Sequence, residues 1–189
     1  MSYSISLVDK ETGKTLELPT GLLAKSNNVH VKFDKNSGYF SPIAFTYAEL
    51  NITYNYSKYF REANENGIRV IYGKTAEESL KILEDMKEKI LEKYYDKDTC
   101  QWLISVKERN RYFDKYGNEI TNPISLVFDR KKNAECTVKT ERYTIDEGPQ
   151  EDYWEDTAGN AIEAINTLID IANMFVLVGY GKKGIWEGD

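Results

Sequence analysis

Apolar residues recur at helical spacing between positions 80 and 94, and this run constrains the fold more than any other feature of the chain. The residues on this helical face are Leu80, Leu83, Met86 or Lys87, Ile90 and Tyr94. Just before the run, Thr75 and Glu78 have the spacing of a capping box, which is a reliable signal for a helix start. We therefore predict a helix over residues 76–94.

Residues 45–56 alternate with a period of two, which predicts a strand with one core face and one polar face. The expected core face comprises Leu50, Ile52, Tyr54 and Tyr56, and the polar face comprises Glu49, Asn51, Thr53 and Asn55. A short helix is expected over 57–64, ending at Gly67. A second long helix is expected over 157–175, where one face carries Ile162, Ile165, Leu168, Ile169 and Ala172.

Further strand signals complete the pattern. They lie at 4–8 with a returning arm at 15–18, and at 29–33, 102–106, 126–128 and 136–143, with turns at 36–38 and 116–118 and a tail over 181–189. Strands and helices occur in separate runs, so the predicted fold is α+β, an antiparallel sheet with the two main helices packed on one face. A length of 189 residues suits a single domain over 1–189, with a β-rich elaboration at 100–145.

Charge and cysteine usage limit the function classes. The net charge of −6 argues against a general nucleic-acid binder, so direct DNA binding is not expected. Cys100 and Cys136 lack any CxxC spacing, which predicts two inert thiols in a reducing compartment. The start has no signal peptide and no apolar stretch approaches 18 residues, so we expect a cytoplasmic protein without a membrane contact.

The residue types needed for common catalytic sites are scarce. His30 is the only histidine, so a nucleophilic triad or a zinc site lacks its usual members. Gly73-Lys74-Thr75 ends like a phosphate-binding loop, but the required glycine is missing at position 68, and the segment also reads as a capped helix start. We expect no enzyme activity, no cofactor and no metal, although folding can still bring two distant carboxylates together.

Charge is distributed in blocks along the chain. Residues 141–156 contain a single base, Arg142, and seven acids: Glu141, Asp146, Glu147, Glu151, Asp152, Glu155 and Asp156. Residues 107–132 are rich in Lys and Arg. Blocks of opposite charge can steer a partner, although ordinary solvated surface has the same composition.

Four segments carry a family resemblance. They are residues 50–57 (LNITYNYS), 67–79 (GIRVIYGKT running on to Glu78-Ser79), Tyr153-Trp154 with 157–161 (TAGNA), and 186–189 (WEGD). In this order they resemble a widespread family of small phage and prophage proteins of Gram-positive bacteria, which includes type II anti-CRISPR proteins. The chain departs from that family after His30, in residues 100–142 and in residues 175–183.

The resemblance implies a phage accessory protein that acts in the cytoplasm of the bacterial host. Such a protein inhibits a host defence complex by binding it, and a CRISPR effector nuclease with its guide RNA is the first candidate partner. The seven acids of 141–156 are then the expected contact residues. Two alternatives stay open. The shared Asn and Trp positions can be structural, with Asn51, Asn55 and Asn160 bonding the backbone and Trp154 and Trp186 clamping the last helix. The chain can also be a small nucleotide-handling or hydrolytic phage enzyme acting on a signalling molecule.

Overall fold

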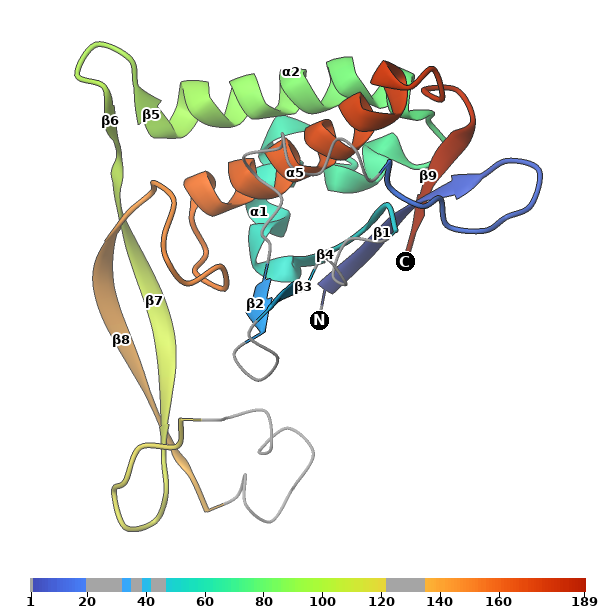
Figure 1. Ribbon diagram of the computed structural model, residues 1–189. Helices are drawn as coiled ribbons and strands as arrows, with labels where there is room; N and C mark the ends of the chain where they lie inside the picture. The colour runs from blue at the N-terminus through green and yellow to red at the C-terminus, as the bar shows by residue number, and fades with distance from the viewer. Residues whose placement is uncertain (1, 20–31, 35–38, 42–46, 122–134) are drawn as a thin grey trace. The chain divides into compact units, whose positions relative to one another are not determined.

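The computed structural model describes residues 2–19, 32–34, 39–41, 47–121 and 135–189. Within these ranges it combines helices with antiparallel sheets, which confirms the predicted α+β fold (Figure 1). The chain divides into two compact units, the first made of Met1–Trp102 with Glu147–Asp189 and the second of Leu103–Asp146. The second unit covers nearly the same residues as the elaboration considered at 100–145, and the single-domain organisation stays a prediction.

The sheet of the first unit is built around its N-terminal strand. β1 (Ser2–Asp9) pairs antiparallel with β4 (Glu49–Thr53) on one side and with β9 (Gly184–Gly188) on the other. Tyr3, Ile5 and Leu7 alternate toward the core and are buried. We expected only a tail over 181–189, because a five-residue strand with two glycines has too few alternating positions to reveal a period of two.

Two long helices cover the core face of this sheet. α2 (Ala76–Tyr94) and α5 (Ala158–Leu177) pack against each other, and Figure 1 shows both on the same side of the sheet. Both capping-box bonds between Thr75 and Glu78 are present, so the GKT segment is a capped helix start. The expected helices and their buried faces are confirmed: Leu83, Ile165 and Leu168 are fully buried, and Leu80 is partly buried.

The strand predicted over 45–56 is shorter than expected. β4 stops at Thr53, and Tyr54–Tyr56 form a 3-10 helix that leads into α1 (Ser57–Ala63). The Thr53 side chain accepts a hydrogen bond from the Asn55 amide, and the Ser57 hydroxyl donates to the Tyr54 carbonyl. These local bonds turn the chain, and Tyr56 still reaches the core from the 3-10 helix. A second 3-10 helix, Gly67–Ile71, follows α1, and Gly67 has a positive φ of 57°.

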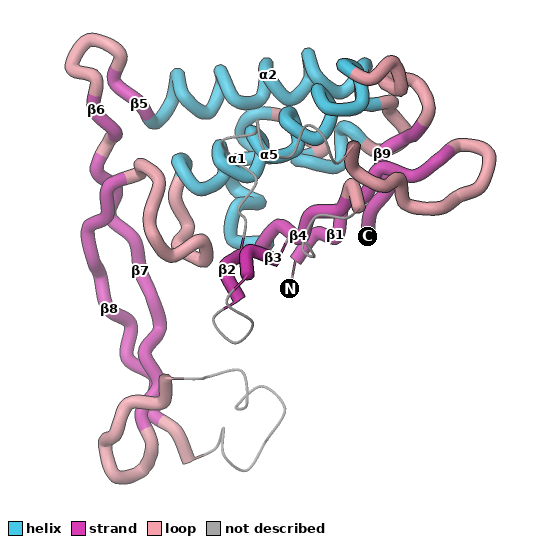
Figure 2. The backbone as a smooth tube through the Cα atoms, viewed as in Figure 1, coloured by secondary structure: helices cyan, strands magenta, loops and turns pink. Residues whose placement is uncertain are grey.

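The second unit is a long two-stranded ribbon. β7 (Ile104–Phe113) pairs antiparallel with β8 (Thr137–Asp146) over ten residue pairs (Figure 2). The turn expected at 116–118 follows β7, where Asp114 accepts from the amides of Tyr116 and Asn118. In the first unit, β5 (Tyr95–Asp96) and β6 (Gln101–Trp102) form a small hairpin.

Some predicted features lie wholly or partly outside the described residues. β2 (Lys32–Asp34) and β3 (Tyr39–Ser41) pair antiparallel. His30, the turn at 36–38 and the strand at 126–128 lie outside the described ranges. The returning arm at 15–18 makes single bridges, Val8 with Thr15 and Glu17 with Tyr47.

Among the described helices, α5 is long and apolar enough to cross a membrane by length and composition alone. This corrects the expectation that no apolar stretch approaches that length. The core helix of a soluble protein passes the same test, and most of the apolar window of α5 is buried inside the protein.

Candidate functional site

The seven acids of 141–156 are divided between the two units. Glu141 and Asp146 belong to β8 in the second unit. The other five belong to the first unit, where they precede α5: Glu147, Glu151, Asp152, Glu155 and Asp156. Neither unit therefore contains all seven acids, although they are close together in the sequence.

Glu147 is fully buried, so the prediction that it contacts a partner is wrong. One oxygen of its carboxylate, Oε2, accepts from the Tyr59 hydroxyl at 2.8 Å and from the Ala158 amide at 2.9 Å. Ala158 opens α5, where free amides and the helix dipole favour a negative charge. Glu147 is thus an internal anchor of the helix start. Burial, followed by the bond to Glu147, raises the pKa of Tyr59 far above its usual range.

Glu141 is engaged within the ribbon. Its carboxylate accepts from Arg109 Nε at 3.2 Å, and Arg111 Nη1 lies 3.6 Å away. The neighbouring pair on the ribbon's other face joins Arg142 to Glu108 at 2.7 Å. These exposed pairs offset the charge of Glu141, so it contributes less negative potential than its place in the sequence indicates.

The remaining acids surround two exposed aromatic side chains in residues 150–156, which we call the acidic loop. Glu151 and Asp152 are exposed, and Glu155 and Asp156 are half-buried. Tyr153 and Trp154 expose 61% and 48% of their surfaces, and their ring centroids lie 4.9 Å apart. Tyr and Trp side chains are enriched at protein-binding surfaces. Trp154 is about half exposed, and its expected role of clamping the last helix stays a prediction.

Hydrogen bonds from three side chains fix the acidic loop. Asn160, in the first turn of α5, donates to the carbonyls of Asp152 and Glu155, both at 3.0 Å, and accepts from the Gln150 amide at 2.8 Å. Asn55 donates to the Trp154 carbonyl at 2.6 Å, and the Tyr56 hydroxyl donates to the Tyr153 carbonyl. The structural role expected for Asn55 and Asn160 is confirmed, and the two aromatic rings are held on a defined backbone.

Tyr56 sits in an acidic environment beneath this loop. Burial raises its pKa to about 12, and the nearby charges of Asp152 and Asp156 act in the same direction. The hydroxyl therefore stays protonated at neutral pH and keeps its role as a donor to the Tyr153 carbonyl. Tyr56 and Asn55 both belong to LNITYNYS, one of the four segments that carry the family resemblance. That resemblance is the sequence feature that pointed to these two residues.

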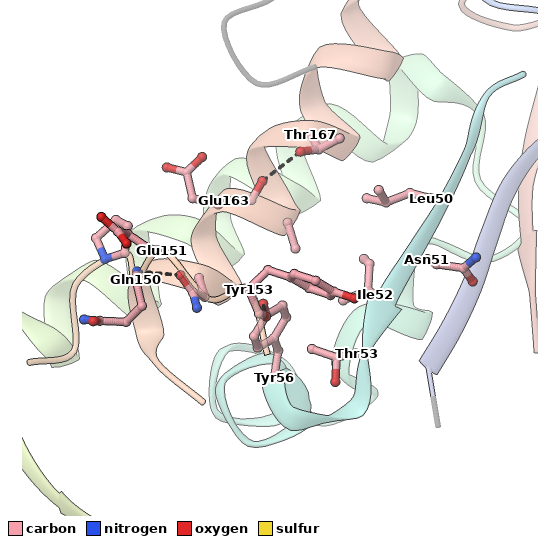
Figure 3. A pocket seen from close by; sticks show the side chains of 13 residues that line it. Leu50, Asn51, Ile52, Thr53, Tyr56, Gln150, Glu151, Tyr153, Glu163 and Thr167 are labelled. Atoms are coloured by element: carbon pink, nitrogen blue, oxygen red, sulfur yellow. Dashed lines mark hydrogen bonds between the residues drawn. The ribbon is translucent and has the colours of Figure 1, made fainter. Parts of the chain in front are cut away.

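A pocket of about 690 Å³ lies between β4, the start of the acidic loop and α5 (Figure 3). Figure 3 shows Tyr153 directed toward Ile52 and Thr53, with Tyr56 beside it. The Thr167 hydroxyl bonds the Glu163 carbonyl within α5, at 3.0 Å. The lining residues are Leu50, Asn51, Ile52, Thr53, Tyr56, Pro149, Gln150, Glu151, Tyr153, Asn160, Glu163, Ala164 and Thr167. Its volume falls in the range of ligand sites.

The pocket has no signal in the sequence because its walls come from segments about 100 residues apart. Among the described residues, no group of three or more His, Cys, Asp or Glu side chains is arranged to hold a metal ion. Cys100 and Cys136 are not part of a disulfide.

Comparison with known proteins adds no relative. No family model matches the chain, and neither the curated proteins nor the solved structures contain a match.

Proposed function

We propose that this chain inhibits a bacterial host defence complex by binding it, with an RNA-guided nuclease as the first candidate target. The observation that carries the proposal is the acidic loop, which displays Tyr153 and Trp154 among four carboxylates on a backbone fixed by Asn55, Tyr56 and Asn160. Aromatic side chains are the residues that most often dominate binding energy at interfaces. A loop that is already ordered loses little conformational entropy when it binds.

The charge of the two units supports the choice of target. The first unit contains 16 basic and 24 acidic residues, a net charge of −8, whereas the second contains 9 basic and 7 acidic residues, a net charge of +2. RNA-guided nucleases hold nucleic acid in a strongly basic channel. The carboxylates of Glu151, Asp152, Glu155 and Asp156 would act as phosphate mimics on that surface, and the charge would chiefly speed association and set specificity.

The resemblance to phage and prophage proteins supports the biological setting. Two of its four segments, LNITYNYS and the Tyr153-Trp154 segment with TAGNA, build the acidic loop and its supports. The setting places the protein in the cytoplasm of an infected cell, where it meets the effector complex and its guide RNA. In this proposal, Asn55, Tyr56 and Asn160 hold the loop backbone so that the rings of Tyr153 and Trp154 face the partner.

The test compares two sets of variants in binding to an RNA-guided nuclease and in protection of target DNA from cleavage. The first set removes the aromatic rings (Tyr153→Ala with Trp154→Ala) or the charges (Glu151→Gln, Asp152→Asn and Glu155→Gln). The control is Asp85→Asn, Glu88→Gln and Glu92→Gln on α2, which removes the same charge from exposed positions elsewhere. We expect at least a tenfold loss of affinity for each loop variant and no change for the control.

Three results would count against the proposal. Inhibition that persists in both loop variants, with no dependence on salt, would place the contact elsewhere on the chain. A purified wild-type protein that neither binds the nuclease nor protects DNA would exclude this target. Turnover of a nucleotide or cyclic nucleotide that a single Asp or Glu substitution abolishes would favour the enzyme alternative.

A further inference from the structure

The pocket beside the acidic loop lies along an edge of the sheet that no other described strand pairs with. In the strand order β4-β1-β9, β4 is an outer strand, and β1 is its only strand partner among the described residues. Four consecutive residues of β4, Leu50 to Thr53, line the pocket. Successive side chains of a strand point to opposite faces, so a pocket that all four touch runs along the strand's edge. That edge presents backbone N–H and C=O groups that another strand can pair with.

The two ends of the pocket differ in chemistry. Half-buried Leu50 forms an apolar wall on β4, next to the buried Ile52, whereas Glu151 and Glu163 lie on the far side, toward the loop and α5 (Figure 3). None of the described residues that line the pocket is Lys or Arg. Neither Glu151 nor Glu163 forms an ion pair within the described part of the chain. Within the described part of the chain, the pocket therefore combines an apolar surface with a negative end that no basic side chain pairs.

The size and rigidity of the pocket suit a short stretch of polypeptide. At about 690 Å³ it exceeds the volume of one side chain. Its loop wall is held by the Asn160 and Tyr56 bonds, so the shape exists before a partner arrives. Recognition by strand addition works in this way, because backbone hydrogen bonds supply affinity and adjoining pockets select alternate side chains.

We propose that the β4 edge and this pocket receive an extended segment of the partner protein, which adds as a strand and places an Arg or Lys side chain against Glu151 and Glu163 with an apolar neighbour on Leu50. The inference rests on the proposed function in that the segment belongs to the inhibited protein. It adds the chemistry of the partner's contact, a basic residue beside an apolar one in an extended stretch. A partner rich in basic residues, as a nucleic-acid-binding effector is, offers such segments.

The test uses the isotope-labelled full-length chain and a capped six-residue peptide of alternating Val and Arg, followed by amide chemical shifts. We expect shifts in residues 50–53, 151 and 163, at least tenfold weaker binding when Gln replaces Arg in the peptide, and a several-fold loss in Glu163→Gln. The matched control, Glu88→Gln on α2, should bind the peptide as the wild type does.

Methylation of the peptide backbone tests strand addition itself. Two versions carry N-methyl groups on alternate amides, one version for each edge of the peptide. Strand addition requires that one version loses binding and the other keeps it. Three results would overturn the inference. The Arg and Gln peptides could bind equally well, or both methylated versions could bind equally well. The folded protein could also show no shifts because its own chain fills the pocket.

These measurements use no nuclease, so the two proposals fail separately. If the protein inhibits the nuclease but shows no chemical-shift changes with the peptide, only the strand-addition inference is wrong. If the protein shows the expected chemical-shift changes but does not bind the nuclease, only the proposed target is wrong.

Discussion

The hydroxyl of Tyr59 donates a 2.8 Å hydrogen bond to the buried carboxylate of Glu147, 88 residues further along the chain. The same carboxylate oxygen accepts from the Ala158 amide at the start of α5. This single acid, which precedes the acidic loop, therefore ties α1 to the first turn of α5. Replacing Glu147 would remove both of these buried hydrogen bonds and so lower the free energy of unfolding.

Glu147→Ala should lower the free energy of unfolding by about 2–4 kcal/mol, because it removes two buried hydrogen bonds and leaves the Ala158 amide without its acceptor, while the Tyr59 hydroxyl keeps the Asp156 carbonyl at 2.9 Å. Tyr59→Phe should lower it by about 1–2 kcal/mol, because the Ala158 bond survives. Urea unfolding followed by tryptophan fluorescence measures both. Glu151→Ala, in the exposed loop, is the control and should change stability by less than about 0.5 kcal/mol. If Glu147→Ala were as stable as that control, the anchor role would be wrong.

Trp186 couples the last strand to α2. Its side chain is fully buried, and its indole N–H donates to the Ser79 hydroxyl at 2.8 Å. Ser79→Ala should destabilise the protein by about 1–3 kcal/mol, because the indole donor is left unpaired. Trp186→Phe together with Ser79→Ala should be less destabilising than the sum of the two single changes, since the unpaired donor is gone. Strict additivity in the thermal or urea unfolding of the four proteins would contradict the pairing.

Gly159 lies in the first turn of α5 against the chain that leads into the acidic loop. A Cβ at this position would overlap the backbone of Gly148 and Pro149, which cannot move aside as a flexible side chain can. Gly159→Ala should lower the free energy of unfolding by about 2–4 kcal/mol and displace the loop. Gly179, after α5, has a φ of 80° but open space around it, so Gly179→Ala should cost only about 1 kcal/mol. Similar losses for the two variants, measured by urea unfolding, would refute the steric argument.

The capping box of α2 should make stability depend on pH. Bonds from the Thr75 backbone and hydroxyl lower the pKa of Glu78 below its usual value. A carboxylate with a lowered pKa in the folded state stabilises the protein above its unfolded pKa, and this contribution is lost as the pH falls through the folded pKa. The wild type should therefore lose more stability than Glu78→Gln between pH 6 and about pH 3. Parallel curves of melting temperature against pH for the two proteins would exclude the effect.

Helix α2 was predictable because its signals are local. The apolar spacing from Leu80 to Tyr94 and the Thr75–Glu78 capping box depend on residues three or four positions apart, and the helix begins and ends where these signals place it. The same holds for α5, whose N-cap Thr157 bonds the Asn160 amide. The strand ending at Thr53 shows the limit of such reasoning. The alternation continues to Tyr56, but side-chain bonds from Thr53 and Ser57 turn the backbone into a 3-10 helix.

The sequence by itself therefore determined the α+β class, the two long helices and their buried faces, because periodicity and capping act over a few residues. The tertiary structure alone decided which acids face solvent. Glu147 and Glu151 lie four residues apart in one acidic segment, yet Tyr59 and α5 enclose the first while the second lies at the rim of a pocket. It also decided that β9 joins β1 and that β4 and α5 enclose a pocket. Such features depend on contacts between residues about 100 or more positions apart, and burial by a distant segment leaves no period in the local sequence.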